Sequence, residues 1–222
     1  MNFSFLLEIK SPWDIIGKSN EGLGLYINLI ILAMAAWTIF VFIERFLAIR
    51  NALEKSELVD NVITDLKDEN INNAIERCKK STLPEARMLE KGLPKIGTPG
   101  GKNNVSLAME NRGKFEILIL EQRLNSLATM AGAAPMVGFL GTVIGMVSVF
   151  YALDESQSLE IKTIAPGIMT AMITTVGGLI VGIIAFMGYN YLVGQIGKVI
   201  YRMEDAAQKI LETINEKQDP KK

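Results

Sequence analysis

The chain reads AAPMVGFLGTVIGM from Ala133 to Met146 and PGIMTAMITTVGGL from Pro166 to Leu179. Both stretches are rich in glycine and alanine, neither contains a charged residue, and their only polar side chains are threonines. Bulky apolar groups suit a lipid-facing surface, whereas small residues in a membrane helix indicate close packing against other helices. We therefore expect two closely packed membrane helices, whose threonines line either a seam between helices or a pore.

Each of these stretches belongs to a longer run without charge. Residues 22–43, 124–153 and 163–197 contain no Asp, Glu, Lys or Arg. A membrane-spanning helix needs about 20 consecutive apolar residues, so all three runs are long enough. The sequence predicts an all-α membrane protein with three transmembrane helices.

The distribution of positive charge predicts the orientation. Basic residues favour the cytoplasmic side of a membrane. The short loop at 154–162 holds three acidic residues and one lysine, whereas the other ends of the second and third runs carry several lysines and arginines. We therefore expect residues 44–123 and 198–222 to be cytoplasmic and residues 1–21 to be periplasmic. The segment 1–21 is compatible with an amphipathic helix at the membrane interface and equally with a loosely ordered tail.

The second and third helices are expected to extend into the cytoplasm. Between residues 105 and 153 the only proline is Pro135, which predicts one helix about 70 Å long at 1.5 Å per residue. The third helix should continue through an apolar stripe at near-heptad spacing. That stripe consists of Ile200, Met203, Ala207, Ile210, Leu211 and Ile214. An apolar stripe on a helix that extends into the cytoplasm needs another surface to cover it. Association with further copies of the same chain is the simplest way to provide that surface.

Small residues recur along one side of each of these two helices. The pairs Gly141/Gly145 and Gly178/Gly182 have the small-x-x-x-small spacing of packed membrane helices. The residues predicted to serve helix packing are Gly138, Gly141, Gly145, Gly178, Gly182 and Pro135, the last as a bend in the second helix.

Four threonines are candidates for a polar path through these helices: Thr142, Thr170, Thr174 and Thr175. Taken singly, a threonine in a membrane helix satisfies its hydroxyl by bonding to a carbonyl one turn earlier. Taken together on the glycine-rich side, they could instead line a pore for ions. Both interpretations remain open at the level of the sequence.

The composition excludes several function classes. A net charge of −1 argues against a nucleic-acid partner, which would require a basic surface. The absence of histidine excludes a catalytic triad and the common zinc sites, and Cys78 is the only cysteine. We expect no enzyme activity, no metal and no cofactor. The second and third runs also lack Asp, Glu, Lys, Arg and His, so a protein that moves protons would have to borrow a proton-carrying group from another chain.

The motif from Ala134 to Met146 resembles the second-span signature A-P-L-L-G-L-L-G-T-V-x-G-M of the MotA/TolQ/ExbB proton-channel family, and most closely its ExbB/TolQ branch. The third span resembles the family's third-span signature. The resemblance covers nearly the whole chain, taking in residues 44–45, 73–78, 86–89, 92–93, 164–168, 174–179 and 189–190.

This resemblance implies a ring-shaped homo-oligomer, typically a pentamer, in the bacterial inner membrane. The ring would surround the single-span helices of an ExbD/TolR-like partner, whose membrane aspartate carries the proton. Through a TonB/TolA-like protein it would energise TonB-dependent transport or Tol-type envelope work. The family's pore threonines correspond to Thr142 and Thr175. Two departures stand out: Thr170 replaces a usual glutamate, and a usual proline is missing near Ile184.

The leading hypothesis is thus a stator-like proton-channel subunit of a motor driven by the proton-motive force. The alternative is a membrane scaffold oligomer that conducts no ions. A secondary transporter fits poorly, because the spans contain neither a charge nor an inverted repeat. The sequence leaves open the process that is driven, the choice between proton and sodium, and the number of subunits.

Overall fold

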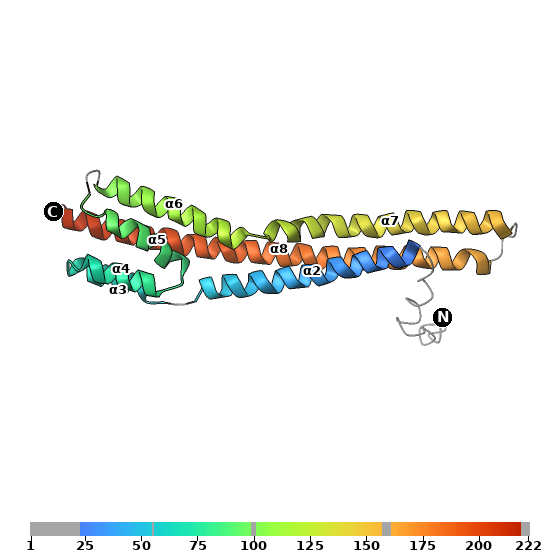
Figure 1. The fold of residues 1–222 in the computed structure, drawn as a ribbon, viewed down its shortest axis with the longest axis horizontal. Coiled ribbons are helices and arrows are strands. Elements are labelled where there is room, and N and C mark those ends of the chain that lie inside the picture. The colour runs from blue at the N-terminus through green and yellow to red at the C-terminus, as the bar shows by residue number, and fades with distance from the viewer. Residues whose placement is uncertain (1–22, 55, 99–100, 157–160, 219–222) are drawn as a thin grey trace, which may run out of the picture. The chain divides into compact units, whose positions relative to one another are not determined.

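The computed structural model describes residues 23–54, 56–98, 101–156 and 161–218, and nearly all of these are helical (Figure 1). The elements are α2 (Leu23–Ala52), α3 (Leu58–Lys67), α4 (Ile71–Lys80), α5 (Pro84–Gly92), the 3₁₀ helix η2 (Leu93–Lys95), α6 (Gly101–Glu121), α7 (Leu124–Ser156) and α8 (Ile161–Gln218). The predicted N-terminal segment 1–21, the middle of the loop at 154–162 and the last residues of the tail lie outside the described residues.

Three stretches of helix are long and apolar enough to cross a membrane, which confirms the predicted all-α membrane class. They are Gly24–Ala52, Asn103–Asp154 and Ile164–Glu216. The third stretch lies within α8, which continues without interruption through the apolar stripe predicted after residue 197.

The second stretch differs from the single regular helix that the sequence predicts. A turn at residues 122–123 separates α6 from α7, and Arg123 has a φ of 65°. A left-handed conformation costs a residue with a side chain about 1–2 kcal/mol. The Arg123 guanidinium donates a hydrogen bond of 2.6 Å to the Glu44 carboxylate, which offsets part of this cost. No glycine or proline marks this turn, so the sequence pattern does not reveal it.

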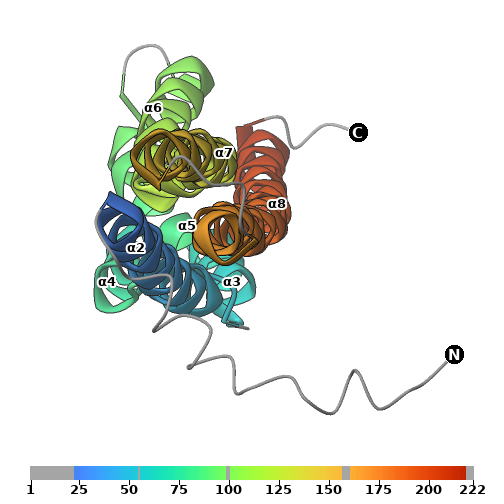
Figure 2. The ribbon, with the colours of Figure 1, turned by 90° about the vertical axis from the view of Figure 1, so that its right-hand side faces the viewer.

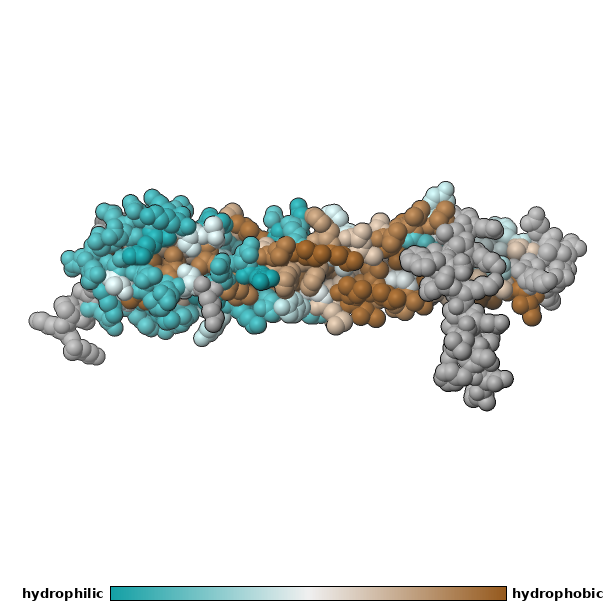
Figure 3. Space-filling view, turned by 90° about the horizontal axis from the view of Figure 1, so that it is seen from below, coloured by the Kyte–Doolittle hydropathy of each residue, from teal (hydrophilic) through white to brown (hydrophobic). Residues whose placement is uncertain are grey.

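The chain forms two compact units, and the long helices contribute to both. The apolar unit consists of Met1–Phe42 and Asn125–Tyr189, and the polar unit of Ile43–Leu124 and Asn190–Lys222. In Figure 3, apolar side chains dominate the visible surface of the first unit and hydrophilic side chains that of the second.

The polar unit has a core of its own, built where α5 lies against α6 and α8. Gly92 of α5 favours this contact, because a Cβ there would require the side chain of Met109 on α6 to shift. From α8, the core receives one side of the predicted apolar stripe, where Met203, Ile210 and Ile214 are buried. Ala207 and Leu211, on the flank of the stripe, are half-buried.

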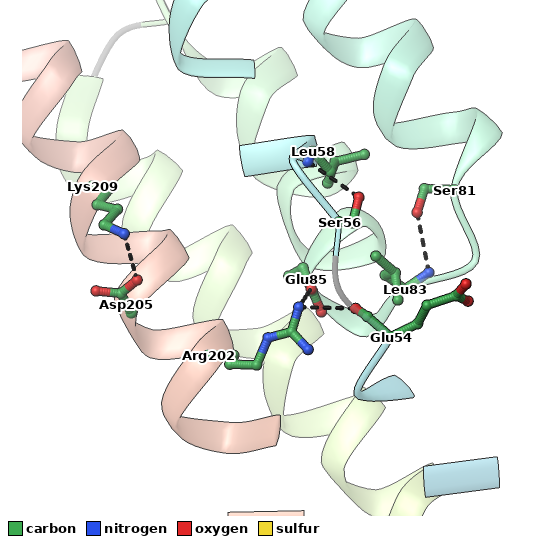
Figure 4. A network of polar contacts seen from close by, with 9 residues as sticks. All are labelled: Glu54, Ser56, Leu58, Ser81, Leu83, Glu85, Arg202, Asp205 and Lys209. Atoms are coloured by element: carbon green, nitrogen blue, oxygen red, sulfur yellow. Dashed lines mark hydrogen bonds and ion pairs between the residues drawn. The ribbon is translucent and has the colours of Figure 1, made fainter. Parts of the chain in front are cut away.

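Buried ion pairs join the helices of the polar unit. The Glu85 side chain on α5 is 3% exposed and accepts a hydrogen bond of 3.1 Å from Arg202 on α8, and the same nitrogen donates to the Glu54 carbonyl (Figure 4). Glu116 of α6 is similarly buried and pairs with Arg87 on α5 at 3.4 Å. Since a buried carboxylate without a partner is strongly destabilising, these arginines fix how the helices dock.

We predict that Arg202→Gln destabilises the polar unit by about 3 kcal/mol, because it leaves the Glu85 carboxylate buried and unpaired. The matched control on the same helix is Lys209→Gln, whose solvent-exposed ion pair with Asp205 should contribute little to stability. Hydrogen exchange of the α5 amides measures both effects in the full chain. Equal α5 protection in the two variants would contradict the role given to Arg202.

The thiol of Cys78 provides a second test of this core. Cys78 is 1% exposed on α4, and burial raises the pKa of its thiol from 9.0 to about 12. Only the thiolate reacts, so a maleimide at neutral pH should label the native protein at least 100-fold more slowly than the denatured protein. The exposed position in Thr82→Cys, placed in a Cys78→Ala background, is the control and should react rapidly. Fast labelling of native Cys78 would show that α4 is not packed as described.

Candidate functional site

The closest approach between helices in the apolar unit is a contact of backbone on backbone between α7 and α8. A Cβ on Gly138 would lie 2.9 Å from the Thr174 carbonyl oxygen and 3.2 Å from the Gly178 Cα. A Cβ on Gly178 would lie 2.5 Å from the Ala134 carbonyl oxygen. Backbone atoms cannot move aside as a flexible side chain can, so both positions require glycine.

This contact continues in both directions along the two antiparallel helices. Toward the α7–α8 connection, a Cβ on Gly145 would lie 2.8 Å from the Gly167 carbonyl oxygen. In the other direction, a Cβ on Gly182 would lie 2.6 Å from the Pro135 ring. We call the contact formed by Gly138, Gly141, Gly145, Gly178, Gly182 and Pro135 the glycine seam.

Helix α2 packs against α8 beside the glycine seam. Figure 2 shows the three helices of the apolar unit end-on, at the corners of a triangle. A Cβ added at Gly177 would lie 3.4 Å from the Ile31 side chain of α2. A Cβ added at Gly188 would lie 2.9 Å from the Phe42 ring of the same helix. Ile31 also belongs to an apolar cluster with Ala134 of α7 and Val181 of α8, so all three helices share one core.

Two of the four candidate threonines lie on the seam. Thr174 is fully buried against Gly141, and its hydroxyl donates to the Ala171 carbonyl of its own helix at 2.9 Å. Thr175 is half-buried, and its hydroxyl crosses the seam to donate to the Gly138 carbonyl at 3.2 Å. Thr175 therefore bonds to the other helix of the seam.

The other two candidates bond within their own helices. The Thr142 hydroxyl donates to the Phe139 carbonyl at 2.6 Å, and that of Thr170 to the Pro166 carbonyl at 3.0 Å. This is the local back-bonding that lets a threonine lie in a membrane helix at low cost. Both side chains remain partly accessible, so their oxygens can still accept a hydrogen bond.

Two polar residues of α2 escaped the sequence analysis. Thr38 is 1% exposed, and its hydroxyl has no hydrogen-bond partner; the buried amide nitrogen of Asn28 is also unpartnered. Thr38 follows Ile31 by two helical turns, on the side of α2 that packs against α8. A single threonine in an apolar run is common, so only this spacing could have drawn attention to it.

The seam offers hydroxyls and backbone groups but no acidic or basic side chain, since residues 124–153 and 163–197 contain no Asp, Glu, Lys, Arg or His. Within the described part of the chain, no group of acidic, cysteine or histidine side chains could hold a metal ion. Such an arrangement can donate hydrogen bonds to water or to a carboxylate from another chain, but it cannot itself release a proton at neutral pH.

We predict that Gly178→Ala destabilises the apolar unit by about 1–3 kcal/mol, because its methyl group would press on the α7 backbone. The matched control is Gly132→Ala on α7, where a Cβ meets nothing within 4 Å. The control should be neutral or slightly stabilising, since alanine favours a helix more than glycine does. Thermal unfolding in mild detergent compares the two. Equal melting temperatures would contradict the close approach at Gly178.

Comparison with known proteins gives a consistent assignment. Residues 80–205, more than half of the chain, match the model of the MotA/TolQ/ExbB proton channel family. The Tol-Pal system protein TolQ of Haemophilus influenzae is 40% identical over 99 residues, which are 45% of this chain and 42% of that protein. The biopolymer transport protein ExbB of Salmonella typhimurium is 35% identical over 85 residues, 38% of this chain and 35% of that protein.

A third relative gives a similar match. The biopolymer transport protein ExbB of Aquifex aeolicus is 42% identical over 77 residues, 35% of this chain and 52% of that protein. In all three cases the match spans about half of the relative's length or less. The shared part carries the family assignment and supports the ExbB/TolQ branch.

Proposed function

The chain belongs to the MotA/TolQ/ExbB proton channel family, and on this premise we propose that it is the stator-like subunit of an inner-membrane motor driven by the proton-motive force. The observation that carries this proposal is the glycine seam. There the Thr175 hydroxyl of α8 reaches the Gly138 carbonyl of α7, and no acidic or basic side chain lies beside them. A proton path needs such a group at membrane depth. Another chain therefore supplies it.

That chain is a single-span protein of the ExbD/TolR type, whose membrane aspartate is the proton carrier. Its helix lies inside a ring of copies of the present chain, and the ring is a pentamer. The N-terminus is periplasmic and the C-terminus cytoplasmic, in keeping with the positive charges that follow the first and third spans and precede the second. This division of labour explains why one chain can have an uncharged seam and still take part in proton transfer.

The hydroxyls have distinct parts in this mechanism. Thr142 and Thr175 hydrogen-bond the partner's carboxylate or the ordered water next to it. Thr174 keeps the seam closed, since it is fully buried and packs against Gly141. Thr170, which bonds to Pro166 in its own helix, supports the path without titrating.

The motor's energy comes from charge that crosses the membrane. Each elementary charge releases about 2.3 kcal/mol per 100 mV. The work passes through a TonB/TolA-like protein to the outer membrane, in TonB-dependent transport or in Tol-type envelope maintenance. The names of the relatives, which are biopolymer transport and Tol-Pal system proteins, support both routes equally.

We predict that Thr175→Val abolishes proton flux and leaves assembly intact, because valine keeps the shape of threonine and removes its hydroxyl. Thr175→Ser keeps the hydroxyl and should retain most of the flux. The matched control is Thr129→Val on α7, where the exposed hydroxyl bonds only to the Asn125 carbonyl of its own helix. Proton uptake by vesicles that contain the complex purified from its own membrane measures all three.

Full flux in the Thr175→Val variant would remove that hydroxyl from the path. If wild-type vesicles with the intact complex take up no protons under a membrane potential, the channel proposal fails. A scaffold without ion flux then accounts for the same seam.

A further inference from the structure

One face of α6 in the polar unit carries large apolar side chains that are at least half exposed, and the Arg112 guanidinium lies over one of them, 5.0 Å from the centroid of the Phe115 ring. Leu107, Phe115 and Leu118 lie at helical spacing on this face and are 56%, 50% and 65% exposed. The charged side chains of Glu110 and Lys114 alternate with them, so lipid does not cover this face. We refer to Leu107, Phe115 and Leu118 as the α6 face.

A second surface of the same unit, on α8, is recessed, whereas the side chains of the α6 face protrude. The recess has a volume of about 880 Å³, and its lining includes Gly194, Gly197 and Tyr201. A Cβ on either glycine would meet nothing within 4 Å, and Tyr201 is 70% exposed. We refer to this surface, with Lys198 at its edge, as the α8 hollow.

The α6 face and the α8 hollow lie at the same height along the unit. Within it, α6 and α8 run antiparallel (Figure 1), and Gly113 faces Met203, with 3.5 Å between the position of an added Cβ and the methionine methyl group. Counting outward from this pair, Phe115 is level with Tyr201, and Leu118 is level with Lys198 and next to Gly197.

We propose that the α6 face of one copy packs into the α8 hollow of a second copy. Phe115 then lies against Tyr201, and Leu118 enters the space above Gly197. The proposal deepens the proposed function and rests on its homo-oligomer, for which it names the contact between neighbouring subunits.

The geometry of this contact determines the kind of assembly. The two surfaces differ, so the contact is heterologous, and repeating it produces either a closed ring or an open filament. The two surfaces lie at the same height along the helices. Each copy is therefore related to the next by a rotation about an axis parallel to the helices, with no translation along that axis. A contact without a rise closes into a ring when its rotation is a whole fraction of a full turn.

Charge complementarity favours a second copy as the occupant. Glu121 is exposed one helical turn beyond Leu118, and Lys198 is exposed beside Gly197. Lys198 has the neutral Gln195 as its hydrogen-bond partner, at 3.3 Å. Docking the α6 face into the α8 hollow brings the Glu121 carboxylate within reach of the Lys198 ammonium of the neighbour.

Cysteine cross-linking between two differently tagged chains tests the contact. One chain carries Leu118→Cys and the other Gly197→Cys; they are co-expressed as full chains and oxidised in the membrane. We expect a disulfide-linked species that carries both tags. The matched control pairs Leu107→Cys with Gly197→Cys: Leu107 is three helical turns from Leu118 on the same face, so this pair should not cross-link.

Charge reversal gives an independent readout that does not depend on cysteine geometry. Glu121→Lys and Lys198→Glu should each reduce the fraction of assembled chain after mild extraction several-fold, and the double variant should restore it. Restoration requires that the two residues meet, which a general loss of stability would not produce.

The outcomes separate this contact from the proposed function. Mixed-tag disulfides at Leu118 but not at Leu107, together with rescue by the double variant, support the contact. If an amine-reactive cross-linker still gives an oligomer but no mixed-tag disulfide forms, the contact is wrong and the proposed function stands. If no reagent links copies in the native membrane, both the contact and the proposed oligomer fail.

Discussion

The arrangement of the apolar unit depends on one constraint, the direct contact between the backbones of α7 and α8 at Gly138 and Gly178. A side chain at either position would collide with carbonyl oxygens or Cα atoms of the other helix. Only this closeness lets the Thr175 hydroxyl reach the Gly138 carbonyl. In a membrane, where helices gain nothing from leaving water, such close packing and hydrogen bonding between helices replace the hydrophobic effect as the source of association.

The seam also gives a physical reason for the division of chemistry between chains that we propose. Helices packed this closely leave no room for a charged side chain and its hydration, and the second and third runs contain none. A titratable group brought by a separate helix can move relative to the seam, whereas one built into the seam would be fixed by packing. In the proposed mechanism, the hydroxyls serve as fixed hydrogen-bonding groups for a mobile carboxylate. The polar unit has a buried interaction of its own, the Glu85–Arg202 ion pair.

Much of this fold follows from the sequence, because a membrane helix needs about 20 uncharged residues and three runs satisfy that length. The glycine spacing likewise predicted a tight contact between the second and third helices. The turn at Arg123 could not be predicted, since no glycine marks it and a tertiary bond to Glu44 helps to hold it. The spacing of the threonines also could not distinguish Thr175, which bonds across the seam, from Thr142, which bonds within its helix. The partner of a hydroxyl depends on the rotation of one helix relative to the next.

The central claim is that this chain forms a ring that borrows its proton carrier. The native mass of the complex, extracted gently from its own membrane, tests it most directly. The account predicts five copies of this chain together with a small single-span protein that carries an aspartate in its membrane segment. A monomer or dimer that survives mild extraction, or a ring that contains no such protein, would contradict it.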